Sequence, residues 1–216
     1  MRITQPDREL LKKFVAAHAP SLTGDILDVG GAGGRYKGFF KNAKTYRVLD
    51  PDTSQHPDIV GTAEEIPLPD RSIDAIVCTQ VLGDVWDLPK AISEMARILR
   101  PGGSLLITES LMNELHDEPH DYWRITPQSW IKLLSPAFDI DLLEARGGYF
   151  SMKTQNAIRR MIEKYRLYDR PLLGRMMNIL ASFMTRAADA RDSREDESLR
   201  RKFAIGFNIL AKKKAS

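Results

Sequence analysis

Short apolar runs that end at turn residues alternate with helical patterns along residues 1–150. Runs of this kind, bounded by glycine, proline or aspartate, are typical of buried strands. Between two of them, apolar residues from Leu88 to Leu99 recur at helical spacing, and Pro101-Gly102-Gly103 is expected to end that helix. The pattern predicts strands at residues 26–29, 46–49, 74–79, 104–108 and 139–145, with further helices near 7–18 and 127–134.

Alternating strands and helices predict an α/β fold with a doubly wound, mostly parallel sheet. The pattern changes after residue 150, where helices are predicted at 152–168 and 171–188. The charged stretch 186–202 is expected to be a solvated helix or a mobile loop, and residues 203–211 return to strand composition. We therefore expect one domain, residues 1–216, with a helical insertion or lid at 151–202 before the last strand.

Composition changes this picture in two respects. The 216 residues include a single cysteine, Cys78, which rules out an internal disulfide or a cysteine-based zinc site and favours a reducing compartment. We find no signal-peptide pattern and no stretch long and apolar enough to span a membrane, so we expect a cytoplasmic protein. The net charge of +3 is divided, because residues 1–150 carry 16 basic and 22 acidic side chains, whereas residues 151–216 carry 16 and 7.

An apolar stripe follows the predicted helix 171–188, with Arg175 and Arg186 beside it. We expect the stripe to pack on the sheet or on a second subunit, which would make a homodimer. A lid over a hydrophobic acceptor and an interfacial helix on an anionic membrane are the alternatives. Nucleic acid is disfavoured, because the basic residues are mixed with acids and lack a stacking pattern. The stripe consists of Leu172, Leu173, Met176, Met177, Ile179, Leu180, Phe183, Met184 and Ala187.

A glycine-rich turn, Gly30-Gly31-Ala32-Gly33-Gly34, follows the first predicted strand, where we expect a helix to begin. Such a turn lets the backbone approach a ligand and directs helix N–H groups at an anionic part of it. A dinucleotide fingerprint fits poorly, because Tyr36 stands at the third glycine position of the best frame. The alternative uses two acids, Asp28 before the glycines and Asp50 after the next strand, where a carboxylate can accept both hydroxyls of a ribose.

In these features the chain resembles the class I S-adenosylmethionine-dependent methyltransferases, over most of residues 26–111 and the final strand. The resemblance implies a seven-stranded sheet, S-adenosylmethionine as cofactor, Asp50 on the ribose and the turn at the methionine end. It also implies that the segment after strand three borders the adenine and that the loop after strand four passes the transferred methyl group. The chain departs from the family pattern at Ala32, Thr62 and Gly83-Asp84. The residues placed at the cofactor are Asp28, Gly30, Gly31, Ala32, Gly34, Asp50, Pro51, Ala63, Glu64, Thr79 and Gln80.

A loop with two histidines, residues 116–127, follows the fifth predicted strand and should leave the sheet at its ligand-binding edge. His120 or His116, polarised by Asp117 or Asp121, could remove a proton from the acceptor. Tyr122, Trp123 and Arg124 could form an aromatic wall and an anion clamp.

The same loop also has a structural interpretation, in which Arg124 pairs with Asp121, Thr126 caps the next helix and Trp123 lies in the core. A metal site at His116 and His120 is a third interpretation, disfavoured by Pro119 between them. We expect no metal. The catalytic candidates are His120, His116, Asp121, Tyr122 and Arg124.

The sequence thus predicts methyl transfer to a small-molecule, glycan or lipid-precursor acceptor, anionic or hydrophobic in character. A non-catalytic S-adenosylmethionine-binding module and a NAD-binding oxidoreductase are the alternatives.

Overall fold

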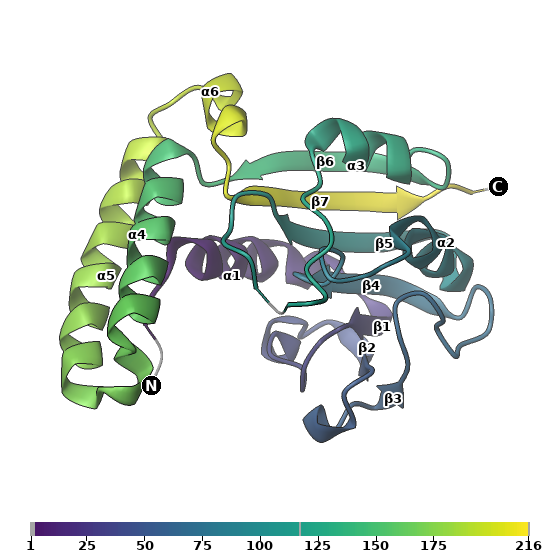
Figure 1. The fold of residues 1–216 in the computed structure, drawn as a ribbon. Helices are drawn as coiled ribbons and strands as arrows, with labels where there is room; N and C mark the ends of the chain where they lie inside the picture. Colours follow the sequence, from purple (N-terminus) through teal and green to yellow (C-terminus); the bar gives the residue numbers. More distant parts are fainter. Residues whose placement is uncertain (1–2, 117, 216) are drawn as a thin grey trace. The chain divides into compact units, whose positions relative to one another are not determined.

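The computed structural model describes residues 3–116 and 118–215, and its central feature is a seven-stranded sheet (Figure 1). Its strand order is β3-β2-β1-β4-β5-β7-β6, in which β1 to β5 pair in parallel and β7 is antiparallel. The predicted α/β class and the mostly parallel, doubly wound sheet are confirmed. The strands are β1 (Gly24–Val29), β2 (Ala43–Asp50), β3 (Ile59–Val60), β4 (Ile73–Thr79), β5 (Leu99–Ser110), β6 (Phe138–Arg146) and β7 (Gly206–Lys213).

The α-helices lie close to the predicted positions. In α2, the side chain of Asp87 accepts a hydrogen bond from the Lys90 N–H and begins the helix, and the apolar residues Leu88, Ile92 and Met95 are buried. Three helices precede the last strand, so the predicted helical insertion is present. The helices are α1 (Pro6–His18), α2 (Leu88–Ile98), α3 (Pro127–Leu134), α4 (Tyr149–Tyr165), α5 (Pro171–Asp192) and α6 (Glu197–Lys202).

The helix expected after the glycine turn does not form. Turns and a short 3-10 helix, Lys37–Phe39, connect β1 to β2 instead. Four residues of the turn have positive φ angles, which a right-handed helix excludes. The argument that helix N–H groups bind the ligand is therefore wrong here. The four are Gly30, Ala32, Gly33 and Gly34.

Pro101-Gly102-Gly103 does not end α2, as the sequence suggested. The helix already ends at Ile98, and these residues lie within β5. Leu99 pairs with Ile73 and the next paired residue of β5 is Ser104, so the register shifts across this segment. A bulge, with Gly102 at φ 76°, therefore takes the place of the predicted helix stop.

The chain divides into two compact units. The helical unit comprises residues 1–13, 111–114 and 144–207, and the sheet unit comprises residues 14–110, 115–143 and 208–216. The predicted insertion, 151–202, falls entirely in the helical unit. Its role as a lid and the assignment of residues 1–216 to one domain stay predictions.

Within the helical unit, α4 and α5 form an antiparallel hairpin (Figure 1). The face of α5 that is buried carries mostly small residues, Gly174, Met177, Ala181, Thr185 and Ala188. Leu172, Met176, Ile179 and Phe183 of the apolar stripe are exposed, whereas its Met177 is buried, so the expectation that the whole stripe packs on the chain itself is wrong. The reason is that small residues allow the two helices to approach closely, and they occupy the opposite side of α5.

The charged stretch 186–202 is largely helical, since α5 continues to Asp192 and α6 follows after a short turn. This confirms the solvated helix rather than the loop for most of it. Among the described residues, no helix is long and apolar enough to cross a membrane.

Candidate functional site

The residues predicted to bind a cofactor or acceptor all belong to the sheet unit. Asp28 lies near the end of β1, while Asp50 and Thr79 are the last residues of β2 and β4. In the sheet, Val29 is the register partner of both Leu49 and Cys78. The strand ends therefore meet at one edge, where open parallel sheets bind their ligands.

The glycine turn is fastened to the end of β2. The Gly30 N–H donates to the Leu49 carbonyl at 2.8 Å, and the Ala32 N–H donates to Asp50 Oδ2 at 3.1 Å. Asp50 Oδ1 accepts from the Asp52 N–H at 2.9 Å. A carboxylate oxygen has two lone pairs, so each oxygen of Asp50 keeps one for a further donor.

Ala32 has a φ of 39°, in the left-handed region that favours glycine. Ala32 therefore lies in a strained conformation, which costs roughly 1–2 kcal/mol. Ala32 is exposed and its N–H is the group bound to Asp50. The strain is thus located where the turn contacts Asp50, the residue predicted to bind the ribose.

Asp28 is a buried carboxyl group, 1% exposed. Its Oδ2 accepts from the Tyr46 hydroxyl at 2.7 Å, whereas Oδ1 has no hydrogen-bond partner among the described residues. Burial raises the pKa of Asp28 to about 7, the Tyr46 hydrogen bond lowers it, and the neighbouring Asp50 raises it further. A Cβ on Gly31 would lie 2.4 Å from Asp28 Oδ2, so only glycine fits against this carboxyl group.

The other predicted cofactor residues differ in how far their side chains are exposed. Pro51 is exposed and Ala63 is buried. Glu64 is half-buried, and its Oε1 accepts from the Asp87 N–H at 2.7 Å, so part of its hydrogen-bonding capacity fastens the start of α2. Thr79 ends β4 and is half-buried.

Gln80 follows directly after β4 with a φ of 57°, a conformation rare for residues other than glycine. Its N–H donates to the Thr108 carbonyl at 2.8 Å, and its Oε1 accepts from the Ser110 hydroxyl at 2.5 Å. The strained backbone thus holds the Gln80 side chain against the end of β5. Backbone outliers of this kind concentrate at functional sites.

Sequence reasoning missed the polar end of β5. Glu109 is only 6% exposed, and its carboxylate accepts from the N–H groups of Gly83, at 3.0 Å, and Ser110, at 2.8 Å. A buried acid at the carboxyl end of a parallel strand belongs to the ligand-binding edge. The change from apolar residues to Thr108-Glu109-Ser110 was the signal that could have revealed it.

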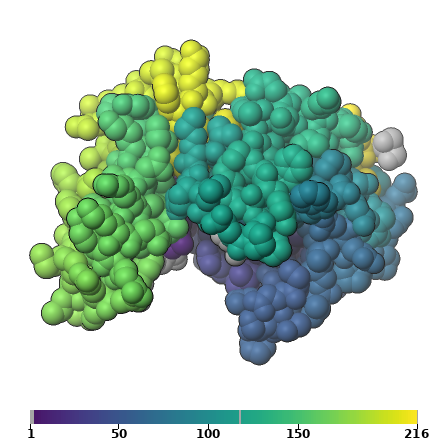
Figure 2. Space-filling view, viewed as in Figure 1, coloured from purple at the N-terminus to yellow at the C-terminus, as the bar shows by residue number. Residues whose placement is uncertain are grey.

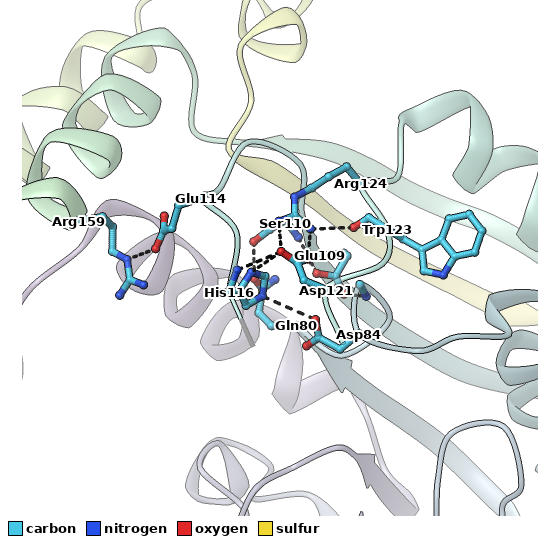
Figure 3. A network of polar contacts seen from close by, with 11 residues as sticks. Gln80, Asp84, Glu109, Ser110, Glu114, His116, Asp121, Trp123, Arg124 and Arg159 are labelled. Atoms are coloured by element: carbon cyan, nitrogen blue, oxygen red, sulfur yellow. Dashed lines mark hydrogen bonds and ion pairs between the residues drawn. The ribbon is translucent and has the colours of Figure 1, made fainter. Parts of the chain in front are cut away.

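The loop after β5 is organised around Asp121 (Figure 3). Asp121 Oδ2 accepts from the His116 N–H at 3.0 Å and lies 3.3 Å from His116 Nδ1. Arg124 donates to both oxygens of Asp121, with Nη2 to Oδ2 at 2.7 Å. These contacts, with Arg124 first, lower the pKa of Asp121 to about 2, and burial opposes them.

The two histidines have different surroundings. His116, the one that contacts Asp121, also has Nε2 3.7 Å from Asp84 Oδ1 (Figure 3). His120 is exposed, and its Nδ1 lies 3.0 Å from the Tyr122 hydroxyl. The structure therefore brings an acid to His116 and not to His120, while Asp117 lies outside the described residues.

The structural interpretation of this loop is borne out at two positions and wrong at a third. Arg124 pairs with Asp121, and the Thr126 hydroxyl accepts from the Ser129 N–H and caps α3. Trp123 is 40% exposed, so it is not a core residue, because its indole N–H reaches the Val85 carbonyl at 2.8 Å near the surface.

An exposed aromatic pair lies in the same unit. Trp86, 72% exposed, meets Tyr122 edge to face with ring centroids 5.2 Å apart. Two adjacent aromatic rings offer a surface for a flat or apolar molecule. Trp86 was not identified from the sequence, because it lies in a loop without a distinct pattern.

The metal hypothesis was built on His116 and His120, but His120 is not in the group of possible ligands found among the described residues. Asp84, His116 and Asp121 do present ligand atoms within 4.8 Å of one another. However, Arg124 holds both oxygens of Asp121, and its positive charge opposes a cation there.

The comparisons with known proteins point to one family. Residues 27–107 match the family model described as a methyltransferase domain. The chain is 43% identical over 102 residues to the ubiquinone/menaquinone biosynthesis C-methyltransferase UbiE of Hahella chejuensis, covering 47% of this chain and 38% of that protein. It is 55% identical over 58 residues to an uncharacterized methyltransferase of Mycobacterium tuberculosis, covering 27% and 24%. The chain therefore matches well under half the length of these curated relatives.

Solved structures show the same fold across nearly the whole chain. The [4+2]-cyclase SpnF superposes with a TM-score of 0.64 at 20% identity, covering 97% of this chain and 81% of that chain. An S-adenosylmethionine-dependent methyltransferase from Mesorhizobium loti superposes with a TM-score of 0.57 at 15% identity, covering 93% and 96%. At such identities the likeness concerns the fold alone. The chain is thus similar to methyltransferases over residues 27–107, and it shares the fold of a solved S-adenosylmethionine-dependent methyltransferase.

Proposed function

We propose that the protein binds S-adenosylmethionine at the carboxyl edge of its sheet and methylates a small-molecule acceptor. The observation that carries the proposal is the joining of Asp50 to the glycine turn through the Ala32 N–H, beside the buried Asp28. When bound, S-adenosylmethionine would supply a methyl group to the acceptor, and the sulfonium sulfur that carried it would leave as a neutral thioether.

The residues present fit this cofactor. Asp28 Oδ1 is a buried acceptor without a partner among the described residues, and Gly31 leaves no room there for a side chain. Asp50 keeps acceptor capacity on both oxygens and would hold the ribose hydroxyls. We assign the methionine end to the turn from Asp28 to Gly34, and the adenine edge to Ala63 and Glu64. Thr79 and Gln80 would flank the methyl group.

On the acceptor side, the chain must orient a nucleophile and remove its proton. We assign the proton acceptor to His116, because Asp121 lies against its Nδ1 and is itself fixed by Arg124. A carboxylate on one ring nitrogen selects the tautomer whose other nitrogen accepts a proton. Here Nε2 faces Asp84, which can share the charge that results.

We assign the acceptor to a hydrophobic or flat small molecule. Trp86 and Tyr122 expose adjacent rings, and the relative from Hahella chejuensis is named for a C-methyltransferase of quinone biosynthesis. Glycan or lipid-precursor acceptors, the other classes that the sequence suggested, would need polar groups beyond this aromatic pair.

Calorimetry with S-adenosylhomocysteine tests the cofactor half. Asp50→Asn should weaken binding by about 1.5–3 kcal/mol, or roughly 10- to 150-fold, because the charge-assisted hydrogen bonds are lost. Asp139→Asn, an exposed carboxylate on β6, is the matched control and should bind as the unaltered chain does. Absence of binding at millimolar ligand, with NADH bound instead, would replace the proposal by the oxidoreductase alternative.

Transfer of labelled methyl groups into a small-molecule extract tests the acceptor half. We expect His116→Gln to lower turnover at unchanged S-adenosylhomocysteine affinity, because the variant lacks the group that takes the acceptor's proton. Turnover lost in His120→Gln instead would move the proton acceptor to that residue. Cofactor binding without any labelled product would identify a binding module.

A further inference from the structure

Among the described residues, six large apolar side chains of α5 are exposed, and we call the surface that they form the α5 face. Four of its residues are 69–75% exposed, and Leu173 and Leu180 are 41% and 49% exposed. Taken together, the exposed surface of these six side chains equals that of nearly four fully exposed large apolar side chains. Apolar residues scattered singly over a surface do not form a patch of this size. The four are Leu172, Met176, Ile179 and Phe183.

The hairpin does not need these side chains for its own packing. Met177 and Ala181 of α5 join a buried cluster with Ile158, Ile162 and Leu167. Met177 and Ala181 lie on the side of α5 opposite the α5 face, because the helical rotation per residue directs them about half a turn away from Ile179 and Phe183. The α5 face is therefore available for something outside the helical unit's core.

The charged side chains along the α5 face itself have one sign, while Asp169 and Asp189 lie just beyond its two ends. From Arg170 to Ala188 the sequence contains no aspartate or glutamate, whereas it contains Arg170, Arg175 and Arg186. At helical spacing, Arg175 and Arg186 fall on the same flank of the face. The surface is thus apolar along its centre and basic along its edge.

Exposed tyrosines occur where the hairpin turns. Tyr165 ends α4 and Tyr168 precedes α5, with 42% and 43% of their surface exposed. Rings with an apolar body and a polar tip are enriched at the boundary between lipid and water. Figure 2 shows the α4 and α5 segments at the surface on the left of the view, with side chains projecting outward.

We propose that the α5 face lies on an anionic lipid surface, with Leu172, Met176, Ile179 and Phe183 in the acyl boundary and the arginines on the headgroups. A helix with an apolar face, an aromatic residue in it and arginine beside it is the kind that binds in the plane of a membrane. α5 has 22 residues but is not apolar all round, and no described helix qualifies as a membrane span. The helix would therefore lie along the lipid surface and not cross it.

A second copy of the chain fits the α5 face less well. Two faces packed antiparallel would bring Arg175 and Arg186 of both copies to one seam, in a stretch that offers no acid. Like charges at such a seam oppose association. An anionic headgroup layer supplies countercharge to the arginines of both ends of the edge at once. The inference does not depend on the proposed methyl transfer, and its test needs no turnover.

Vesicle co-sedimentation of the full chain tests the proposal. We expect binding to phosphatidylcholine vesicles that contain about one third phosphatidylglycerol, and weak binding to pure phosphatidylcholine, because each arginine near the surface contributes about fivefold in affinity. Ile179→Ser with Phe183→Ser should lower binding by about tenfold or more. Val60→Ser, at an exposed apolar residue of β3, is the matched control and should bind as the unaltered chain does.

Charge and association variants complete the test. Arg175→Gln with Arg186→Gln should lower binding to anionic vesicles by roughly 25-fold and leave the low binding to neutral vesicles unchanged. Circular dichroism should show an unchanged melting transition in every variant, because all the altered residues are exposed. Equal binding to neutral and anionic vesicles, or none to either, overturns the proposal. A dimer in sedimentation equilibrium that Ile179→Ser with Phe183→Ser dissociates would assign the face to a second copy instead.

Discussion

Replacing Asp28 by asparagine should make the protein more stable at high pH and leave it little changed at low pH. The Asp28 carboxyl is 1% exposed, and burial raises its pKa from 3.8 to about 7. Such a change corresponds to about 4 kcal/mol of preference for the neutral form. The neutral amide of asparagine has nearly the same shape and carries no charge to bury.

The direction of the effect follows from proton binding. Between about pH 4 and pH 7 the folded chain keeps the Asp28 proton that the unfolded chain has lost, so the free energy of unfolding falls as pH rises through this window. Asp28→Asn removes that dependence. The stability of the variant relative to the unaltered chain should therefore rise by about 4 kcal/mol from the lower to the upper end of the window.

Urea unfolding followed by circular dichroism measures this difference at about pH 4.5, 6 and 8. Asp139→Asn controls for the loss of one exposed carboxylate. Parallel stability curves for Asp28→Asn and the unaltered chain would contradict this prediction, since they would mean that Asp28 ionises as readily in the folded chain as in the unfolded one.

Three further substitutions have effects that follow from single contacts. Ala32→Gly relieves a φ of 39° and should raise the free energy of unfolding, measured with urea, by up to about 1 kcal/mol. A decrease would mean that the turn is unstrained. Arg146→Leu leaves its partner Asp7, 8% exposed in its side chain, buried without a countercharge, and should cost about 3–5 kcal/mol in the same assay. Asp192→Ala removes the carboxylate that accepts from two N–H groups at the start of α4, and should lower stability by about 2–3 kcal/mol and shorten that helix by circular dichroism.

The periodic parts of the chain could be predicted from sequence because their signals are local. The range 127–134 was predicted for a helix and α3 is Pro127–Leu134, since Thr126 and Pro127 mark its start. The glycine turn was located correctly, but its conformation was not. Whether four residues adopt positive φ depends on how the turn is fastened to Asp50 and Leu49, which are distant in sequence.

Burial of the apolar stripe could not be predicted for a different reason. A helical wheel of α5 shows an apolar side, but it gives little weight to the small residues Gly174, Ala181 and Ala188, which are the buried ones. Which side of a helix is buried depends on the closeness of the neighbouring helix, and small residues permit the closest approach. The hydrophobicity of the large residues therefore indicated that a surface of α5 needs a covering partner, but it did not indicate which element or molecule covers it.

Assigning the proton acceptor required the tertiary structure, because the sequence favoured neither histidine. His116 and His120 both have acids nearby in the chain, and only the fold of the loop decides which one Asp121 reaches. Arg124 holds Asp121 ionised with a pKa of about 2, so the carboxylate beside His116 is charged at neutral pH. The ion pair that sequence reasoning set against a catalytic role is thus compatible with one, since a fixed, charged Asp121 is what an orienting group for His116 requires.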